Sequence, residues 1–219
     1  MRNIKLGVNI DHVATLRNAR NEKNPDTVEA TRVALSSGGD MVVMHLRGDR
    51  RHIRDSDLER IRREVKGMIH LEMAATREME KIALKVRPDS VCIVPETAGE
   101  VTTQGGLKLT GKLIELEKLI RNISKAGIEV SLFTDPEPQS IRAAHNIGAD
   151  SIELCTTRYS ESWGRKLQVK ELEQLQLASF LVKELKMSLH AGHGLDYYNV
   201  VPVARIEGMD CLNIGYSII

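Results

Sequence analysis

The 219-residue chain has the composition of an ordinary folded protein, with 42% hydrophobic and 28% charged residues and a net charge of +1. Aromatic side chains make up only 3% of the residues. Because nucleic-acid-binding proteins usually present a basic face, often with stacking aromatic side chains, this composition disfavours such a role. No run approaches 18 apolar residues, and the first residues lack the apolar core of a signal peptide. We therefore expect a cytoplasmic protein without a membrane segment.

Eight short apolar runs, most of them ending in a polar or charged residue, recur along the chain. They cover residues 6–12, 41–47, 68–74, 90–96, 128–135, 150–156, 187–194 and 211–217. Their continuous apolar character is typical of parallel strands covered by helices. Helical periodicity separates several of them, at residues 26–37, 56–66, 141–147 and 168–186, with Asp55 or Ser56 as the N-cap of the second helix. Eight strand–helix units predict an α/β fold of the (β/α)₈ TIM barrel type, with residues 1–219 as a single domain. An open, flavodoxin-like sheet is the structural alternative.

The predicted barrel departs from the minimal pattern at its loops and at its end. Residues 11–25, 96–110 and 156–167 are predicted loop insertions on the C-terminal side of the strands, where barrel active sites form. The chain ends four residues after Gly215, where an eighth helix is expected. We therefore expect the eighth helix to be missing, which would expose apolar side chains on the first and eighth strands.

The three cysteines, Cys92, Cys155 and Cys211, all lie inside apolar strand-like runs. Their number is odd and their spacing fits no metal motif. The pattern predicts buried thiols in a reducing compartment.

A histidine and a cationic loop follow the second run. His45 can exchange protons near neutral pH. Arg47, Arg50, Arg51 and His52 come directly after it. Guanidinium groups bind phosphate through paired hydrogen bonds, so this loop suits an anionic substrate. A solvated loop at the start of a helix is the equally weighted alternative.

Two carboxylates stand inside apolar strands, Glu72 in the third run and Glu153 in the sixth. Burial of an acidic group is costly and raises its pKa toward the range of a general base. The alternative is a carboxylate at the barrel rim paired with an arginine. Glycine-rich segments at residues 191–195 and 213–216 follow the last two runs, where barrels of this kind commonly bind phosphate. Glycines that merely turn the chain are the alternative there.

Other chemistries are disfavoured. No lysine stands at a strand end, which disfavours an aldolase that forms a Schiff base with the enzyme. His190 and His193 could ligate zinc, but no third ligand is evident, so no metal is predicted. No Gly-x-Gly-x-x-Gly motif follows the first run, so no nucleotide cofactor is indicated.

The ordered motifs of the whole chain resemble those of the pyridoxine 5′-phosphate synthase family. They are GVNIDHVATLRNAR (7–20), HLRGDRRHI (45–53), LEMA (71–74), PE…EVTTQGGL (95–107), AGIEVSLF (126–133), AGHGL (191–195) and LNIG (212–215). The resemblance implies a (β/α)₈ barrel with additional helices that forms a homo-oligomer, commonly an octamer. It also implies an enzyme without metal or organic cofactor. The implied reaction condenses 3-amino-2-oxopropyl phosphate with 1-deoxy-D-xylulose 5-phosphate into pyridoxine 5′-phosphate, with release of phosphate and water.

The resemblance also implies roles for individual residues. His45 and Glu72 match general bases, His193 matches a general acid, and Glu153 matches a group that supports a transition state. Contacts to the aminoketone phosphate are matched by Asn9, Arg20, Gly194, Gly215 and Tyr216. Contacts to the deoxyxylulose phosphate are matched by Asp11, His12, Arg47, His52 and Thr102.

The chain departs from the family pattern at a few positions. Gly48 stands where the family usually has Glu, Cys155 and Thr157 replace the His and Gly of a His-Thr-Gly run, and Tyr216 replaces a common His. A different phosphate-handling barrel and a non-catalytic sugar-phosphate-binding relative are the alternative functions. The presence of His45, Glu72 and His193 together favours the synthase.

Overall fold

The computed structural model describes residues 4–96, 105–111 and 113–219. Its eight parallel strands form a closed barrel in which each strand pairs with the next and β8 pairs with β1. The strands are β1 (Lys5–Asn9), β2 (Met41–Leu46), β3 (Met68–Met73), β4 (Ser90–Ile93), β5 (Glu129–Thr134), β6 (Ser151–Cys155), β7 (Ser188–Gly192) and β8 (Met209–Ile214). The predicted TIM barrel is confirmed. The open-sheet alternative is wrong, because an open sheet has two edge strands that pair on one side only, whereas every strand here pairs on both sides.

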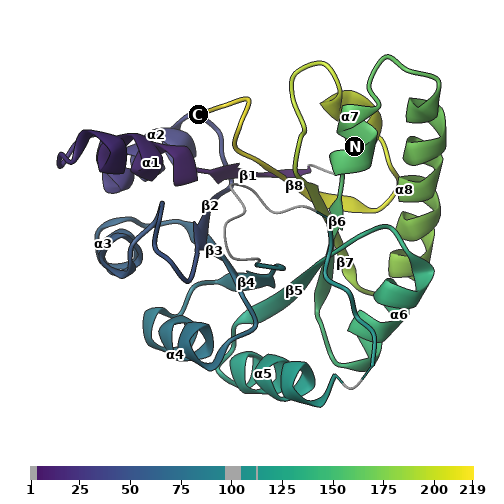
Figure 1. Cartoon of the computed structure of the whole chain (residues 1–219), viewed down its shortest axis with the longest axis horizontal. Helices are drawn as coiled ribbons and strands as arrows, with labels where there is room; N and C mark the ends of the chain where they lie inside the picture. Colours follow the sequence, from purple (N-terminus) through teal and green to yellow (C-terminus); the bar gives the residue numbers. More distant parts are fainter. Residues whose placement is uncertain (1–3, 97–104, 112) are drawn as a thin grey trace.

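The helices lie outside the strands (Figure 1). They are α1 (Asp11–Arg20), α2 (Thr27–Ser36), α3 (Asp55–Glu64), α4 (Arg77–Val86), α5 (Ile114–Lys125), α6 (Pro138–Asn146), α7 (Thr157–Glu161), α8 (Leu167–Glu184) and α9 (Val200–Ala204). The helices predicted at 26–37, 56–66 and 168–186 correspond to α2, α3 and α8 within two residues at each end. The helix predicted at 141–147 begins earlier, because Pro138 is well suited to the first turn of α6.

Two segments predicted as loops contain helices. Residues 11–25 include α1, which begins with an acidic residue, Asp11, and buries Ala14 and Arg17. Residues 156–167 include the short α7, which buries Tyr159. The predicted N-cap of α3 is also wrong, since the helix is capped at Arg54, whose backbone N–H donates to Asp57.

Successive residues of each strand face opposite sides of the barrel wall. On β3, Ile69 and Leu71 belong to the apolar core between sheet and helices. The alternate residues His70 and Glu72 therefore face the barrel interior. This alternation places polar side chains inside the barrel and the main apolar core outside it.

The sheet closes at β8 although residues 215–219 form a turn rather than a helix. The expected exposure of apolar side chains on β1 and β8 is largely wrong. Val8, Leu212 and Ile214 are at most 9% exposed, and only Leu6 is half-buried. The turn after α2 lies close to Val8 at Gly39, and α9 packs against β8. Within the described residues, no helix is both long enough and apolar enough to cross a membrane.

Candidate active site

A cavity of about 250 Å³ opens at the C-terminal ends of the strands. It is lined by Asn9, Asp11, His12, His45, Arg47, His52, Glu72, Val94, Phe133, Glu153, His193, Gly194, Leu195, Asn213, Ile214, Gly215 and Tyr216. All the predicted site residues are in this lining except Arg20 and Thr102. Arg20 is exposed at the end of α1, and Thr102 falls outside the described residues.

Asp11 connects the ends of β1 and β2. The Asn9 side-chain amide donates to Asp11 Oδ2 at 3.1 Å, and the Asp11 backbone N–H donates to Asn9 Oδ1 at 2.9 Å. Asp11 Oδ1 accepts from the backbone N–H of His45 at 2.9 Å. Burial raises the pKa of Asp11 to about 6, against the opposing effect of these hydrogen bonds and of Arg47. The carboxyl therefore fixes the position of His45 relative to β1.

His45 and Glu72 are register partners on β2 and β3, with 3.9 Å between His45 Nδ1 and Glu72 Oε2. Burial, assisted by Arg47 and His52, lowers the pKa of His45 to about 3. Burial raises the pKa of Glu72 well above its usual value, and the carboxylates Glu153 and Asp11 add to that rise. At neutral pH His45 is thus an uncharged imidazole, and the contact is not an ion pair. His45 Nε2 has no hydrogen-bond partner among the described residues and is available as a proton acceptor.

Arg47 supplies the positive charge of the cavity. Its side chain is buried, and neither Nε nor Nη2 has a hydrogen-bond partner within the described residues. A buried guanidinium without partners is costly, so this arrangement suits an anionic ligand that would accept both hydrogen bonds.

The rest of the cationic loop divides between the cavity and the surface. His52 lines the cavity and lies 2.7 Å from the Thr15 hydroxyl through Nδ1. Arg50 instead pairs with Asp55 and Glu78, and Arg51 pairs with Asp49. The prediction of an anion-binding loop therefore fits Arg47 and His52 but not Arg50 and Arg51.

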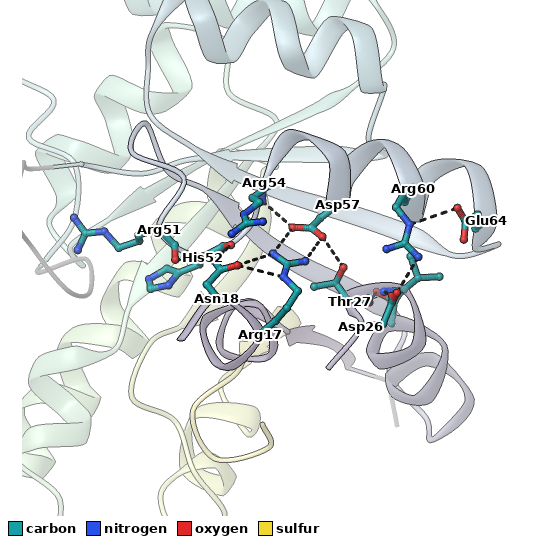
Figure 2. A network of polar contacts seen from close by, with 12 residues as sticks. Arg17, Asn18, Asp26, Thr27, Arg51, His52, Arg54, Asp57, Arg60 and Glu64 are labelled. Atoms are coloured by element: carbon teal, nitrogen blue, oxygen red, sulfur yellow. Dashed lines mark hydrogen bonds and ion pairs between the residues drawn. The ribbon is translucent and has the colours of Figure 1, made fainter. Parts of the chain in front are cut away.

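A network of polar contacts fixes this loop against α1, α2 and α3 (Figure 2). The Asn18 side-chain amide donates to the carbonyls of Arg51 at 3.0 Å and His52 at 2.9 Å. Arg17 donates to Asn18 and to Asp57. Asp57 also accepts from the Thr27 hydroxyl and the Arg54 backbone N–H, each at 2.9 Å.

The loop after β7 holds His193 in an unusual backbone conformation. His193 has φ +78°, in the left-handed region that is strained for a non-glycine residue. The Thr156 hydroxyl donates to the carbonyl oxygens of Gly192 at 2.7 Å and His193 at 2.6 Å. Gly194 follows with φ +78°, and a Cβ there would lie 2.2 Å from Ser160 Oγ, so only glycine fits. Burial lowers the pKa of His193. The backbone of this loop thus brings His193 to the lining of the cavity.

Glu153 forms part of the deep wall of the cavity. Its Oε2 accepts from the Asn213 side-chain amide at 2.7 Å and lies 3.8 Å from His70 Nε2. Burial acts to raise the pKa of Glu153, but His70, His190 and Asn213 outweigh that effect and lower it. The two acidic groups Glu72 and Glu153 therefore have pKa values shifted in opposite directions.

Comparison with known proteins gives consistent matches across the barrel. Residues 6–219 match the family described as "Pyridoxal phosphate biosynthesis protein PdxJ". The chain belongs to the PdxJ family. A pyridoxine 5′-phosphate synthase of Elusimicrobium minutum is 54% identical over 217 residues, 99% of this chain and 90% of the relative. Relatives with the same name from Syntrophotalea carbinolica and Synechococcus sp. are 50% and 49% identical over 214 and 216 residues. These alignments cover 98% and 99% of this PdxJ chain and 90% of each relative.

The positions where this PdxJ chain departs from the family pattern have local partners. The backbone N–H of Gly48 donates to Glu96 Oε1 at 2.8 Å. Cys155 Sγ lies 3.1 Å from the Thr157 hydroxyl. All three cysteines are buried free thiols, as predicted. The departures therefore leave Arg47 and Glu153 in the cavity wall.

Two groups of side chains within the described residues of this PdxJ chain could each offer three metal-ligand atoms within 4.8 Å of one another. They are Asp11, His45 and Glu72, and His70, Cys92 and Glu153. Neither group contains His190 or His193, the pair considered above as zinc ligands from the sequence. The absence of a metal stays a prediction.

Sequence reasoning missed the residues one layer below the predicted site. Asn213 lies two residues before Gly215, and His70 lies two residues before Glu72, so each faces the barrel interior. A polar residue two positions before a strand end was the available signal. The interior therefore contributes to the site as well as the strand ends.

Proposed function

We propose that this protein is a pyridoxine 5′-phosphate synthase that condenses 3-amino-2-oxopropyl phosphate with 1-deoxy-D-xylulose 5-phosphate. The observation that carries the proposal is that one cavity holds the uncharged imidazole of His45 and the guanidinium of Arg47, whose Nε and Nη2 have no hydrogen-bond partner among the described residues. Proton transfer and phosphate recognition are both needed for this reaction. The names of the relatives at 49–54% identity support the same product.

The first step joins the two substrates. The amine of the aminoketone attacks the ketone of the deoxyxylulose phosphate, and loss of water gives an imine. The substrate supplies the nitrogen, so no lysine is required. Arg47 and His52 bind the deoxyxylulose phosphate together with Asp11, His12 and Thr102. Asn9, Gly194, Gly215 and Tyr216, which line the cavity, bind the aminoketone phosphate. The family resemblance assigns Arg20 to the same substrate, although this residue is exposed at the end of α1 and lies outside the lining.

Ring closure then requires proton transfers between carbon and oxygen atoms. His45 and Glu72 take protons, because the first is uncharged at neutral pH and burial makes the second a stronger base than an ordinary glutamate. His193 returns a proton to a leaving oxygen. Glu153, held as an anion, stabilises the positive charge that develops when the imine nitrogen is protonated. Elimination of inorganic phosphate and water completes the pyridine ring, and no metal or organic cofactor takes part.

We also propose that the 219 residues act as one cytoplasmic domain within a homo-oligomer, with an octamer as the expected size. The three buried free thiols suit a reducing compartment. Val169, Leu177 and Phe180 on α8 are 63–67% exposed and fall within about 80° of arc at 100° per residue. Such an apolar stripe suits contact with a second copy of the chain.

The test is to incubate purified protein with both substrates and to follow phosphate release and the absorbance of the pyridine product. We expect both signals to appear together and to depend on both substrates. Binding of the phosphate esters without product would instead indicate a non-catalytic sugar-phosphate-binding relative.

A further inference from the structure

His70 lies inside the barrel directly beneath the proposed catalytic layer. It is fully buried on β3, two residues before Glu72 and on the same side of the strand. Its Nδ1 lies 2.6 Å from the hydroxyl of Ser90, its register partner on β4. If this hydroxyl donates to Nδ1, the proton of the neutral ring must sit on Nε2. Ser90 therefore fixes the orientation of the ring.

The free side of the ring is directed at Glu153. His70 Nε2 lies 3.8 Å from Glu153 Oε2 and has no hydrogen-bond partner among the described residues. This distance is too long for a strong hydrogen bond but short enough for an N–H dipole or a cation to favour the carboxylate. The same oxygen accepts from Asn213 at 2.7 Å. Asn213 on β8 and His70 on β3 thus both face one oxygen atom of Glu153.

Glu153 and Glu72 influence each other, since the negative charge of Glu153 adds to the rise in the pKa of Glu72. When two carboxylates interact this strongly, their protons leave in two steps that belong to the pair. The neighbours of each group decide which one is the stronger base. His70 contacts only the Glu153 side of this pair.

We propose that His70, oriented by Ser90, is a positioning residue that holds Glu153 as an anion and so makes Glu72 the stronger base of the pair. The inference rests on the proposed function, because it concerns the acid–base roles of those two carboxylates. His70 lies below the cavity, outside its lining, and would influence the reaction only through Glu153.

Other titratable groups also influence the ionisation of Glu153 and His70. Those that act on Glu153 from the surrounding strands and loops are Glu72, Cys92, Cys155, His190, His193 and Cys211. His190 also faces His70, with 6.2 Å between the ring centroids. Burial and the proximity of His70 both lower the pKa of His190. Of the titratable groups, His70 is the one whose ring nitrogen lies 3.8 Å from Glu153 Oε2, and it is the one we assign to favouring the anion of Glu153.

The experiment measures kcat against pH for the intact protein and for His70→Asn. Asparagine is too short to reach both Ser90 and Glu153. Without His70 the Glu153 carboxyl keeps its proton to a higher pH. Turnover needs Glu153 as an anion and Glu72 as a base, so the acidic limb of the kcat profile, which follows the loss of the last proton of the pair, should move up by about half a unit to one unit. KM for both substrates should stay within about twofold, because His70 does not line the cavity. Ser90→Ala should move the limb in the same direction by less.

Two controls separate this role from a structural one. His145→Asn changes an exposed histidine on α6, and Ser131→Ala changes an equally buried serine on β5. Both substitutions should leave the acidic limb of the kcat profile at the pH of the unaltered protein. A lower melting temperature of His70→Asn with an unmoved limb would overturn the proposal. If the unaltered protein forms no product at all, the proposed function fails instead.

A measurement on the unaltered protein keeps the proposal testable should a variant not fold. Ring-nitrogen NMR, with His70 assigned through its contact with His190, should show a proton on Nε2 at neutral pH. A bare Nε2 would overturn the proposal, because it would repel the Glu153 carboxylate.

Discussion

At the scale of single residues, the cavity separates proton acceptors from fixed charges. Burial lowers the pKa of His45 and raises those of Asp11 and Glu72. Each of these shifts disfavours the charged form of the side chain relative to the same group in water. Arg47 Nε and Nη2 have no hydrogen-bond partner among the described residues, so this guanidinium provides the attraction for a phosphate. Proton transfer and anion binding are thus assigned to different residues.

Replacing Glu72 by Gln should abolish turnover and keep the fold. We expect kcat to fall by about 10²–10⁴-fold, the usual contribution of a general base. Because burial raises the pKa of Glu72, its ionised form destabilises the folded state as the pH rises. The neutral amide should therefore be as stable as the wild type, or more so at high pH, in urea unfolding. Glu115→Gln, at an exposed position on α5, is the control. A collapse of stability in Glu72→Gln would indicate a structural carboxylate.

Replacing His45 by Asn should make the protein less sensitive to acid. The pKa of His45 is about 3 in the folded state against a reference value of 6.5, so the unfolded chain binds more protons between these values. The wild type should lose stability relative to His45→Asn as the pH falls from 6.5 toward 4, by up to about 1.4 kcal/mol per pH unit. Urea unfolding at pH 7 and pH 5 measures this difference. Equal slopes for the two proteins would contradict it.

At the scale of elements, α1, α2 and α3 form one support for the loop after β2. Asp57 on α3 binds Arg17 on α1 and Thr27 on α2, and Asn18 on α1 holds the loop carbonyls (Figure 2). The loop carries Arg47 and His52 into the cavity. Stability of this support and substrate binding should therefore change together.

Asp57→Asn should weaken both, because it leaves the buried Arg17 guanidinium without its counter-ion. Breaking one side of a buried ion pair costs about 3–5 kcal/mol, which denaturant unfolding would detect. The Kd for 1-deoxy-D-xylulose 5-phosphate should rise as the loop loosens. Arg60→Gln is the matched control, since its partly exposed pair with Asp26 should contribute no more than about 1 kcal/mol. If Asp57→Asn is destabilised but binds 1-deoxy-D-xylulose 5-phosphate with unchanged affinity, the polar network does not influence substrate binding.

At the scale of the whole molecule, the barrel closes on its own but leaves an apolar stripe on α8. The β1–β8 pairing completes the sheet, and most outward side chains of these strands are buried. The stripe of Val169, Leu177 and Phe180 remains exposed. Assembly is therefore expected to use a helix face rather than an open sheet edge.

Phe180→Glu should reduce the mass of the assembly measured by light scattering after gel filtration, because a charge would be buried in the contact. Ile114→Glu, at a similarly exposed position on α5, should leave the mass unchanged. The same mass for wild type and Phe180→Glu would show that α8 takes no part in the contact between subunits.

The sequence alone determined the barrel and most of the site, because strands, strand ends and helix periods are local patterns. Eight apolar runs placed His45, Glu72 and Glu153 at one mouth, and the structure confirms that they share a cavity. Local patterns could not show that Arg50 turns to surface partners, nor that residues 11–20 form α1. Those outcomes depend on which side chains the folded chain brings together.

Only the tertiary structure decided the charge states and the second layer of the site. The pKa directions of Asp11, His45 and Glu153 come from burial and from partners on other strands. The contact of His70 with Ser90 joins neighbouring strands, and its contact with Glu153 reaches across the barrel interior. A strand pattern gives the side of the wall that each residue faces, but barrel closure sets the distances between them.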